Sequence, residues 1–181
     1  GNLFTFKITL TPIPFTLMGL PLAIFLGFRN TTAYDRYWEG RKLWGELVLR
    51  TRNLSRQCLS LIELDQPVDP ANRAGDVRVR MVHRAIAFVH ALRLHLRSQS
   101  DDALLQRWLP AQDWPRVAQS SVRPEAIMQG LGQDLRQCLR EGRIDPCLAA
   151  GIDTTLSAMT ASAASCERIR NTPVPFSYTL L

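Results

Sequence analysis

The sequence lacks the residue patterns on which most enzymes and metal proteins depend. It contains no catalytic triad, no paired carboxylates in an apolar setting, no phosphate-binding glycine loop and no HExxH motif. None of its cysteines forms a CxxC pair, and His83, His90 and His95 do not have the spacing of zinc ligands. We therefore expect no enzyme activity, no cofactor and no bound metal. We expect the cysteines to be reduced, small core residues; they are Cys58, Cys138, Cys147 and Cys166.

The sequence also lacks any charged side chain over residues 8–28. A helix needs roughly 18 or more such residues to cross about 30 Å of hydrocarbon, so this run predicts a transmembrane helix. Lys7 precedes the run, and the basic residues that follow it are Arg29, Arg36, Arg41, Lys42, Arg50, Arg52 and Arg56. By the positive-inside rule, we expect residues after about 29 to be cytoplasmic and the helix to lie in the cell (inner) membrane.

The formal net charge of +6 does not by itself indicate nucleic-acid binding. Most of the excess is explained by membrane orientation, and a nucleic-acid interface would also need aromatic or base-reading side chains on a basic face. We therefore expect membrane lipid, and no nucleic acid, among the partners.

Proline and glycine interrupt the uncharged run, at Pro12, Pro14, Gly19, Pro21 and Gly27. Proline removes a backbone donor, and in a membrane such a break is tolerated where protein or a water-filled cavity satisfies the loosened backbone. Pro21 therefore indicates either a helix that faces a pore or an ordinary kinked helix inside a bundle.

No strand pattern is apparent, and the fold class expected is all-α: a membrane-spanning helix that continues into a cytoplasmic helical bundle. An apolar stripe at helical spacing extends the first helix to about residue 65; it comprises Ala33, Tyr37, Gly40, Trp44, Leu47, Thr51, Leu54, Cys58 and Leu61. Turn-forming residues predict a loop over 66–76 and short pieces with turns over 98–121. Helices are predicted at 77–97, at 124–140 and from 145–146 to about 170.

This pattern predicts four regions: a transmembrane helix at 8–28, its cytoplasmic continuation at 29–65, a cytoplasmic helical domain at 77–171 and the start of another membrane segment at 172–181. The first seven residues have the character of an external loop. We therefore expect the chain to be part of a longer protein.

Three blocks of sequence resemble the bestrophin family, including its bacterial members. They are FLGFRNTTAYDRYWEGRKLWGEL at 25–47, which begins in the last four residues of the uncharged run, EGRIDPC at 141–147 and ERIRNTPVPFSYTLL at 167–181. The resemblance implies a homopentameric channel for small inorganic ions, either chloride and other anions or monovalent cations. The family's calcium-binding region has no counterpart here, so calcium activation is not implied.

The resemblance also implies a hydrophobic neck, made of apolar rings one helical turn apart on the pore-lining helix. The matching positions are Leu20, Ile24 and Phe28, which share one helix face at i, i+4 and i+8. An apolar constriction obstructs ions because it tends to lose its water. The alternative is that these side chains face lipid or pack inside a bundle.

A second, cytoplasmic aperture is implied at Cys147, where relatives carry an apolar residue such as isoleucine; Leu148 is the alternative position. Just past the neck, Arg29 and Asn30 either attract anions into a vestibule or simply follow the positive-inside pattern. Vestibule or membrane-interface positions are also expected for Arg36, Tyr37 and Trp38, and a core position for Trp44. A competing hypothesis is a membrane-tethered helical scaffold that binds a protein partner without conducting.

Overall fold

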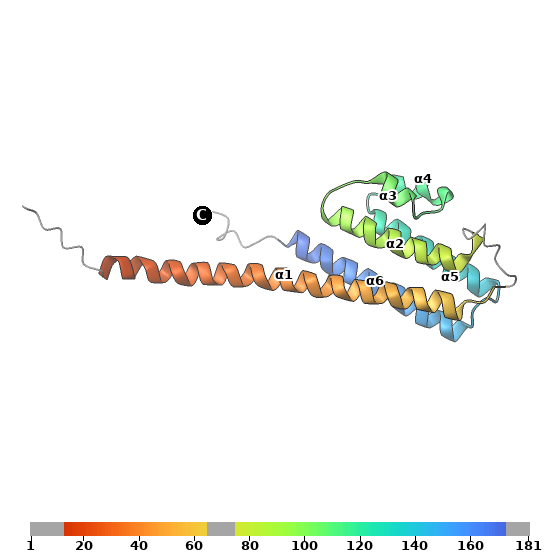
Figure 1. Ribbon diagram of the computed structural model, residues 1–181, viewed down its shortest axis with the longest axis horizontal. Coiled ribbons are helices and arrows are strands. Elements are labelled where there is room, and N and C mark those ends of the chain that lie inside the picture. The colour runs from red at the N-terminus through yellow and green to blue at the C-terminus, as the bar shows by residue number, and fades with distance from the viewer. Residues whose placement is uncertain (1–12, 65–74, 173–181) are drawn as a thin grey trace, which may run out of the picture. The chain divides into compact units, whose positions relative to one another are not determined.

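The computed structural model describes residues 13–64 and 75–172, and the side chains of residues 13–16, 25, 28 and 29 lie outside this description. Within these limits the chain contains helices and no strands, which confirms the all-α fold class. Figure 1 shows helices α1 (Ile13–Leu61), α2 (Val77–Leu96), α3 (Asp102–Gln106), α4 (Trp114–Gln119), α5 (Arg123–Arg140) and α6 (Pro146–Asn171). A short 3₁₀ turn, η2 (Ala111–Asp113), precedes α4.

The chain divides into two compact units, and the boundary lies within α1, between Glu39 and Gly40. The first unit contains α1 up to Glu39. The second, which we call the bundle, contains the described residues from Gly40 onward. This boundary is defined by contacts between residues, whereas the predicted boundary at 28/29 is the point where the helix would leave the membrane. The two boundaries describe different properties, so the predicted regions stay predictions.

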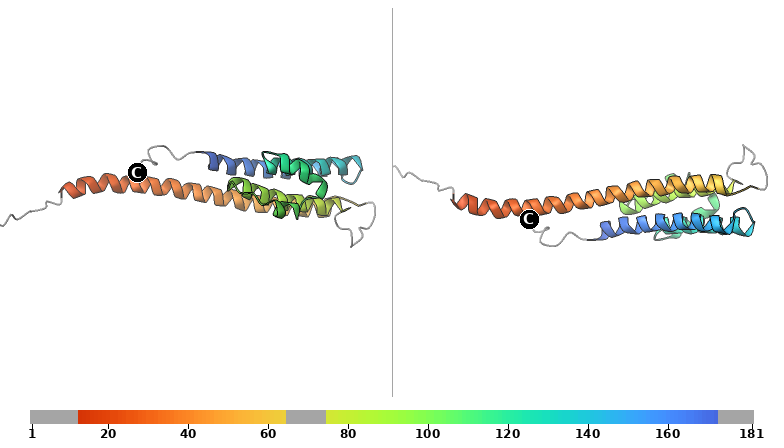
Figure 2. Two further views of the ribbon diagram at one scale, coloured as in Figure 1. Left: turned by 90° about the horizontal axis from the view of Figure 1, so that it is seen from above. Right: turned by 90° about the horizontal axis from the view of Figure 1, so that it is seen from below.

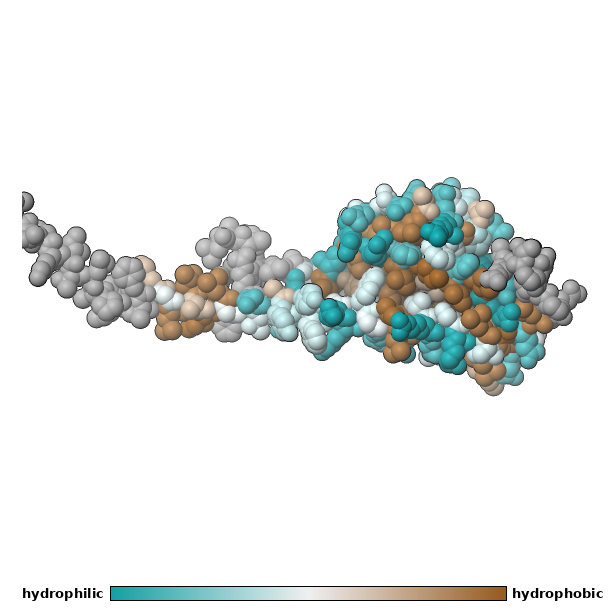
Figure 3. Space-filling model, in the orientation of Figure 1, coloured by the Kyte–Doolittle hydropathy of each residue, from teal (hydrophilic) through white to brown (hydrophobic). Residues whose placement is uncertain are grey.

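In the first unit, large apolar side chains are exposed on opposite sides of α1. They are Leu17, Met18, Leu20, Leu22, Ile24 and Leu26, each more than half exposed, and in Figure 3 this part of α1 is hydrophobic. Successive residues of an α-helix are about 100° apart, so these positions lie on two opposite sides of the helix. The helix is continuous through Pro21.

Within the part of the chain that the structure describes, none of the helices has both the length and the apolarity required to cross a membrane. The predicted span begins at residue 8, and residues 8–12 lie outside the described part. So does the predicted membrane segment at 172–181, apart from Thr172.

The bundle packs α2 and α5 side by side and α6 against both, while the buried face of α1 from Leu47 onward joins the same core; two further views are given in Figure 2. Each helix contributes fully buried apolar side chains, among them Leu54, Met81, Phe88, Leu131 and Ile152. Burying a side chain of this kind stabilises the fold by about 1.5–3 kcal/mol.

The helix ends follow local sequence signals. The Asp76 side chain accepts a hydrogen bond from the Arg78 backbone N–H at 2.8 Å and caps α2. Asp145 caps α6 in the same way through Cys147 N–H at 2.7 Å. Helix α1 ends at Leu61, earlier than predicted, because the backbone N–H of Glu63 donates instead to the Arg143 carbonyl at 2.8 Å.

Candidate functional site

Leu20 and Ile24, two members of the predicted neck, lie one turn apart on the same face of α1. Their side chains are 66 % and 52 % exposed. Position 28 continues this face by helical geometry, but the Phe28 side chain lies outside the described part. We call these three positions the neck face.

A second apolar row, formed by Met18, Leu22 and Leu26, runs along α1 with the same four-residue spacing. It is displaced from the neck face by two residues, or about 200°, and therefore lies on the opposite side of the helix. Because both rows are exposed, a single chain does not select which one lines a pore. The neck assignment stays a prediction.

The residues predicted for the vestibule or interface lie further along the same helix. Tyr37 and Trp38 are 61 % and 46 % exposed, Asn30 is exposed and Arg36 is half-buried. The Arg29 side chain lies outside the described part. Their roles stay predictions.

Trp44 lies farther along α1, in the bundle. Its side chain is half-buried and packs against the hydrophobic core, which confirms the predicted core position.

Both candidates for the second aperture lie in the first turn of α6. Cys147 is exposed, and Leu148 is 45 % exposed. Both side chains are accessible in the single chain, and the choice between them stays a prediction.

The predicted core position is wrong for Cys147 and correct for the other cysteines. Cys58, Cys138 and Cys166 are buried, whereas Cys147 follows the Asp145 cap at the start of α6, where the first turn faces solvent. Burial, with smaller contributions from Cys138 and Asp134, raises the pKa of the Cys58 thiol to about 12.

A buried charge cluster in the bundle was missed at the sequence level. Arg84 is 4 % exposed and donates to Asp113 at 2.6 and 2.8 Å, to the Gly130 carbonyl at 2.9 Å, and to Asp134. Arg80, one turn earlier, donates to Asp134 at 2.9 and 3.1 Å. These bonds join α2 to η2 and α5. The sequence feature that could have indicated this cluster is the spacing of Arg80 and Arg84, which are four residues apart on a helix that also buries an apolar face.

Glycine at position 130 is explained by this cluster. A Cβ added there would lie 3.1 Å from Arg116 Nη2 and 3.2 Å from Arg84 Nε. The guanidinium groups can approach the α5 backbone closely because Gly130 has no side chain.

Comparison with known proteins now places the chain in a family. The family model described as bacterial/fungal bestrophin protein matches residues 1–181. The chain belongs to the bestrophin family. A voltage-dependent anion channel-forming protein of Ralstonia nicotianae is 42 % identical over 96 % of this chain and 55 % of its own length. The protein YneE of Escherichia coli K12, with the same description, is 37 % identical over 96 % of this chain and 54 % of its own length.

The solved structures agree with this membership. A bacterial bestrophin homologue from Klebsiella pneumoniae matches with a TM-score of 0.83 and 34 % identity, covering 96 % of this chain and 61 % of that chain. This bestrophin chain thus spans about half the length of the curated relatives it matches.

Proposed function

We propose that this chain forms the pore helix and the cytoplasmic bundle of an anion-channel subunit. The observation that carries the proposal is the similarity, over 96 % of the chain, to relatives named voltage-dependent anion channel-forming proteins. In this proposal five identical subunits surround one axial pore in the cell membrane, and residues after about 29 are cytoplasmic.

The neck face is the proposed barrier to ion flow. Leu20, Ile24 and Phe28 would form three apolar rings about 6 Å apart along the axis, since four residues of helix rise 4 × 1.5 Å. Such rings offer an ion no hydrogen-bonding groups to replace its hydration shell, so the barrier falls as the neck widens and fills with water.

Two features of the chain support this reading. Large apolar side chains are exposed on opposite sides of α1 over residues 17–26, so the helix needs cover from lipid on one side and from other subunits or a narrow pore on the other. Arg29 and Asn30 come directly after the neck, where a positive charge raises the local anion concentration.

A set of alanine substitutions on the neck face tests the assignment. We expect Leu20→Ala, Ile24→Ala and Phe28→Ala together to raise single-channel conductance or to hold the channel open, because the smaller rings admit water. The measurement is chloride current through planar bilayers that contain the complete polypeptide carrying these residues.

The opposite row supplies the matched control. Met18→Ala, Leu22→Ala and Leu26→Ala remove similar apolar volume with the same spacing from the other side of α1, and we expect currents close to those of the unmodified protein. Unchanged currents in the neck variant, or an open channel in the control, would refute the neck assignment.

The alternative function, a membrane-tethered scaffold, is distinguished by assembly and leak. The scaffold hypothesis predicts that light scattering in detergent detects a monomer or dimer and that liposomes containing the protein do not leak chloride. The channel requires a particle of five subunits and a leak through it.

A further inference from the structure

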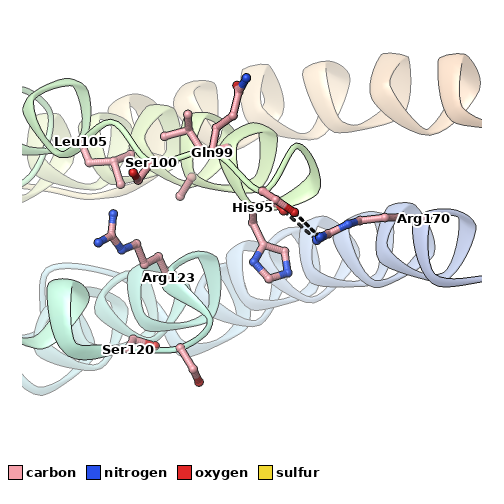
Figure 4. Close-up of a pocket in the computed structure, with 11 residues that line it drawn as sticks. His95, Gln99, Ser100, Leu105, Ser120, Arg123 and Arg170 are labelled. Carbon is pink, nitrogen blue, oxygen red and sulfur yellow. Dashed lines mark hydrogen bonds between the residues drawn. The ribbon is translucent and has the colours of Figure 1, made fainter.

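A small cavity in the bundle opens where the end of α2, the start of α5 and the end of α6 come together (Figure 4). Its volume is about 240 Å³, below the roughly 300–1,000 Å³ of pockets that hold drug-sized ligands. It therefore suits a small ion or a single functional group and not a whole nucleotide.

The lining of this cavity is cationic and rich in hydrogen-bond donors. Guanidinium groups come from Arg123 and Arg170, and His95 contributes an imidazole. The other polar residues of the lining are Ser98, Gln99, Ser100, Ser120 and Ser121. Among the described residues that line this cavity there is no aspartate or glutamate. Guanidinium groups donate and never accept hydrogen bonds, so the lining favours an anion.

Existing contacts hold both arginines in place without exhausting their donors. Arg170 Nη1 donates to the His95 carbonyl at 2.7 Å and Nη2 to Ser98 Oγ at 2.6 Å; in Figure 4 this side chain extends from α6 to the end of α2. Arg123 Nη1 donates to Asp102 at 2.7 Å, and its guanidinium stacks 5.7 Å from the Trp114 ring centre. A guanidinium has five N–H donors, so each retains N–H groups for a ligand.

A neighbouring cavity differs from this one in composition. It has a volume of about 180 Å³ and shares His95, but its lining also includes Glu125, Glu167 and apolar groups such as Met128. The Glu167 carboxylate lies 3.5 Å from His95 Nε2. The lining of this second cavity contains two carboxylates, whereas the lining of the first contains none and the nearby Asp102 carboxylate is paired with Arg123.

We propose that the cavity between Arg123 and Arg170 binds a small oxyanion of the phosphate class. The guanidinium groups match the geometry of a phosphate group, and the serine hydroxyls donate further hydrogen bonds to it. A bound phosphate group would link α2, α5 and α6. This site does not depend on the proposed channel function, and binding is measured separately from conduction.

Calorimetry on the complete polypeptide in phosphatidylcholine nanodiscs tests the site. Inorganic phosphate is titrated at constant ionic strength, with chloride as the reference anion. We expect saturable phosphate binding that Arg123→Gln weakens about tenfold, since a charge-assisted hydrogen bond is lost. The control is Arg136→Gln, an exposed arginine of the same helix outside the lining. Absence of phosphate binding, equal binding of chloride, or equal weakening by the control would overturn the proposal.

A second variant separates binding from folding. Ser100→Ala combined with Ser121→Ala keeps every charge and removes two hydroxyls from the lining; we expect weaker phosphate binding with an unchanged melting temperature. Unchanged phosphate affinity in this variant contradicts the proposed contacts.

Nanodiscs that contain phosphatidic acid identify the source of the phosphate group. If this lipid weakens the binding of inorganic phosphate, a lipid headgroup reaches the site. If the affinity for inorganic phosphate is unaltered, a free phosphate is the ligand. Both outcomes support a site that recognises a phosphate group.

Discussion

Replacing Asp134 by asparagine removes the negative charge at the centre of the buried cluster and keeps the shape of the side chain. The carboxylate is 5 % exposed and pairs with Arg80 at 2.9 Å and with Arg84. In the Asp134→Asn variant both guanidinium groups remain buried or nearly so, while one of their counter-charges is gone.

The expected loss of stability follows from this geometry. Removing one partner of a buried ion pair costs about 3–5 kcal/mol, because the other charge stays buried without compensation. Arg84 keeps Asp113 and the Gly130 carbonyl, so the lower end applies, about 3 kcal/mol. For a domain of this size that corresponds to a fall in Tm of about 6–12 °C.

An exposed ion pair of the same chain gives the matched control. Arg50 and Glu46 lie 3.1 Å apart at i, i+4, with side chains 40 % and 44 % exposed. Such pairs contribute about 0–1 kcal/mol, so Glu46→Gln should lower Tm by little. Both variants are compared with the unmodified protein by circular dichroism at 222 nm during heating. Equal effects of Asp134→Asn and Glu46→Gln would refute the reasoning that burial sets the magnitude.

Two further predictions concern the capping aspartate and the thiols. Burial alone would raise the pKa of Asp76, but hydrogen bonds from the side chain and backbone of Arg78 outweigh it and lower the pKa. The stability that this cap contributes is therefore present above the unfolded pKa of about 3.9 and is lost as the pH falls through the lower folded pKa. We expect Asp76→Ala to lower the free energy of unfolding by about 0.5–2 kcal/mol near neutral pH and by less in acid. A difference in Tm that does not change with pH would contradict this. Maleimide at pH 7.5 should modify the exposed Cys147 quickly, and should modify the buried Cys58, whose pKa is about 12, only after unfolding. Mass spectrometry of the labelled peptides measures the two rates, and early labelling of Cys58 would contradict the prediction.

Most of the helical framework could be predicted from the sequence, because its signals are local. Pro124 in the first turn of α5 and the Asp145 cap of α6 mark where helices begin, and both predicted starts agree with the structure to within a residue. The end of α1 was placed four residues too late, because a backbone hydrogen bond to the distant Arg143 replaces the continuing helix.

Less of the candidate site could be predicted. Helical spacing places Leu20 and Ile24 on one face, but large apolar residues also occupy the opposite face of this part of α1, so periodicity does not tell which of the two faces is covered by neighbouring groups. In the proposed channel that choice depends on neighbouring chains and lipid.

The sequence by itself determined the long helices, the start of α6 at its Asp145 cap and the family. Only the tertiary structure decided that Arg84 lies between Asp113 and Asp134, which are 29 and 50 residues away along the chain, and that Arg123 and Arg170 line one cavity. Helix periodicity and capping act over a few residues, whereas these groups meet only when separate helices pack, and packing depends on the summed burial of all of them.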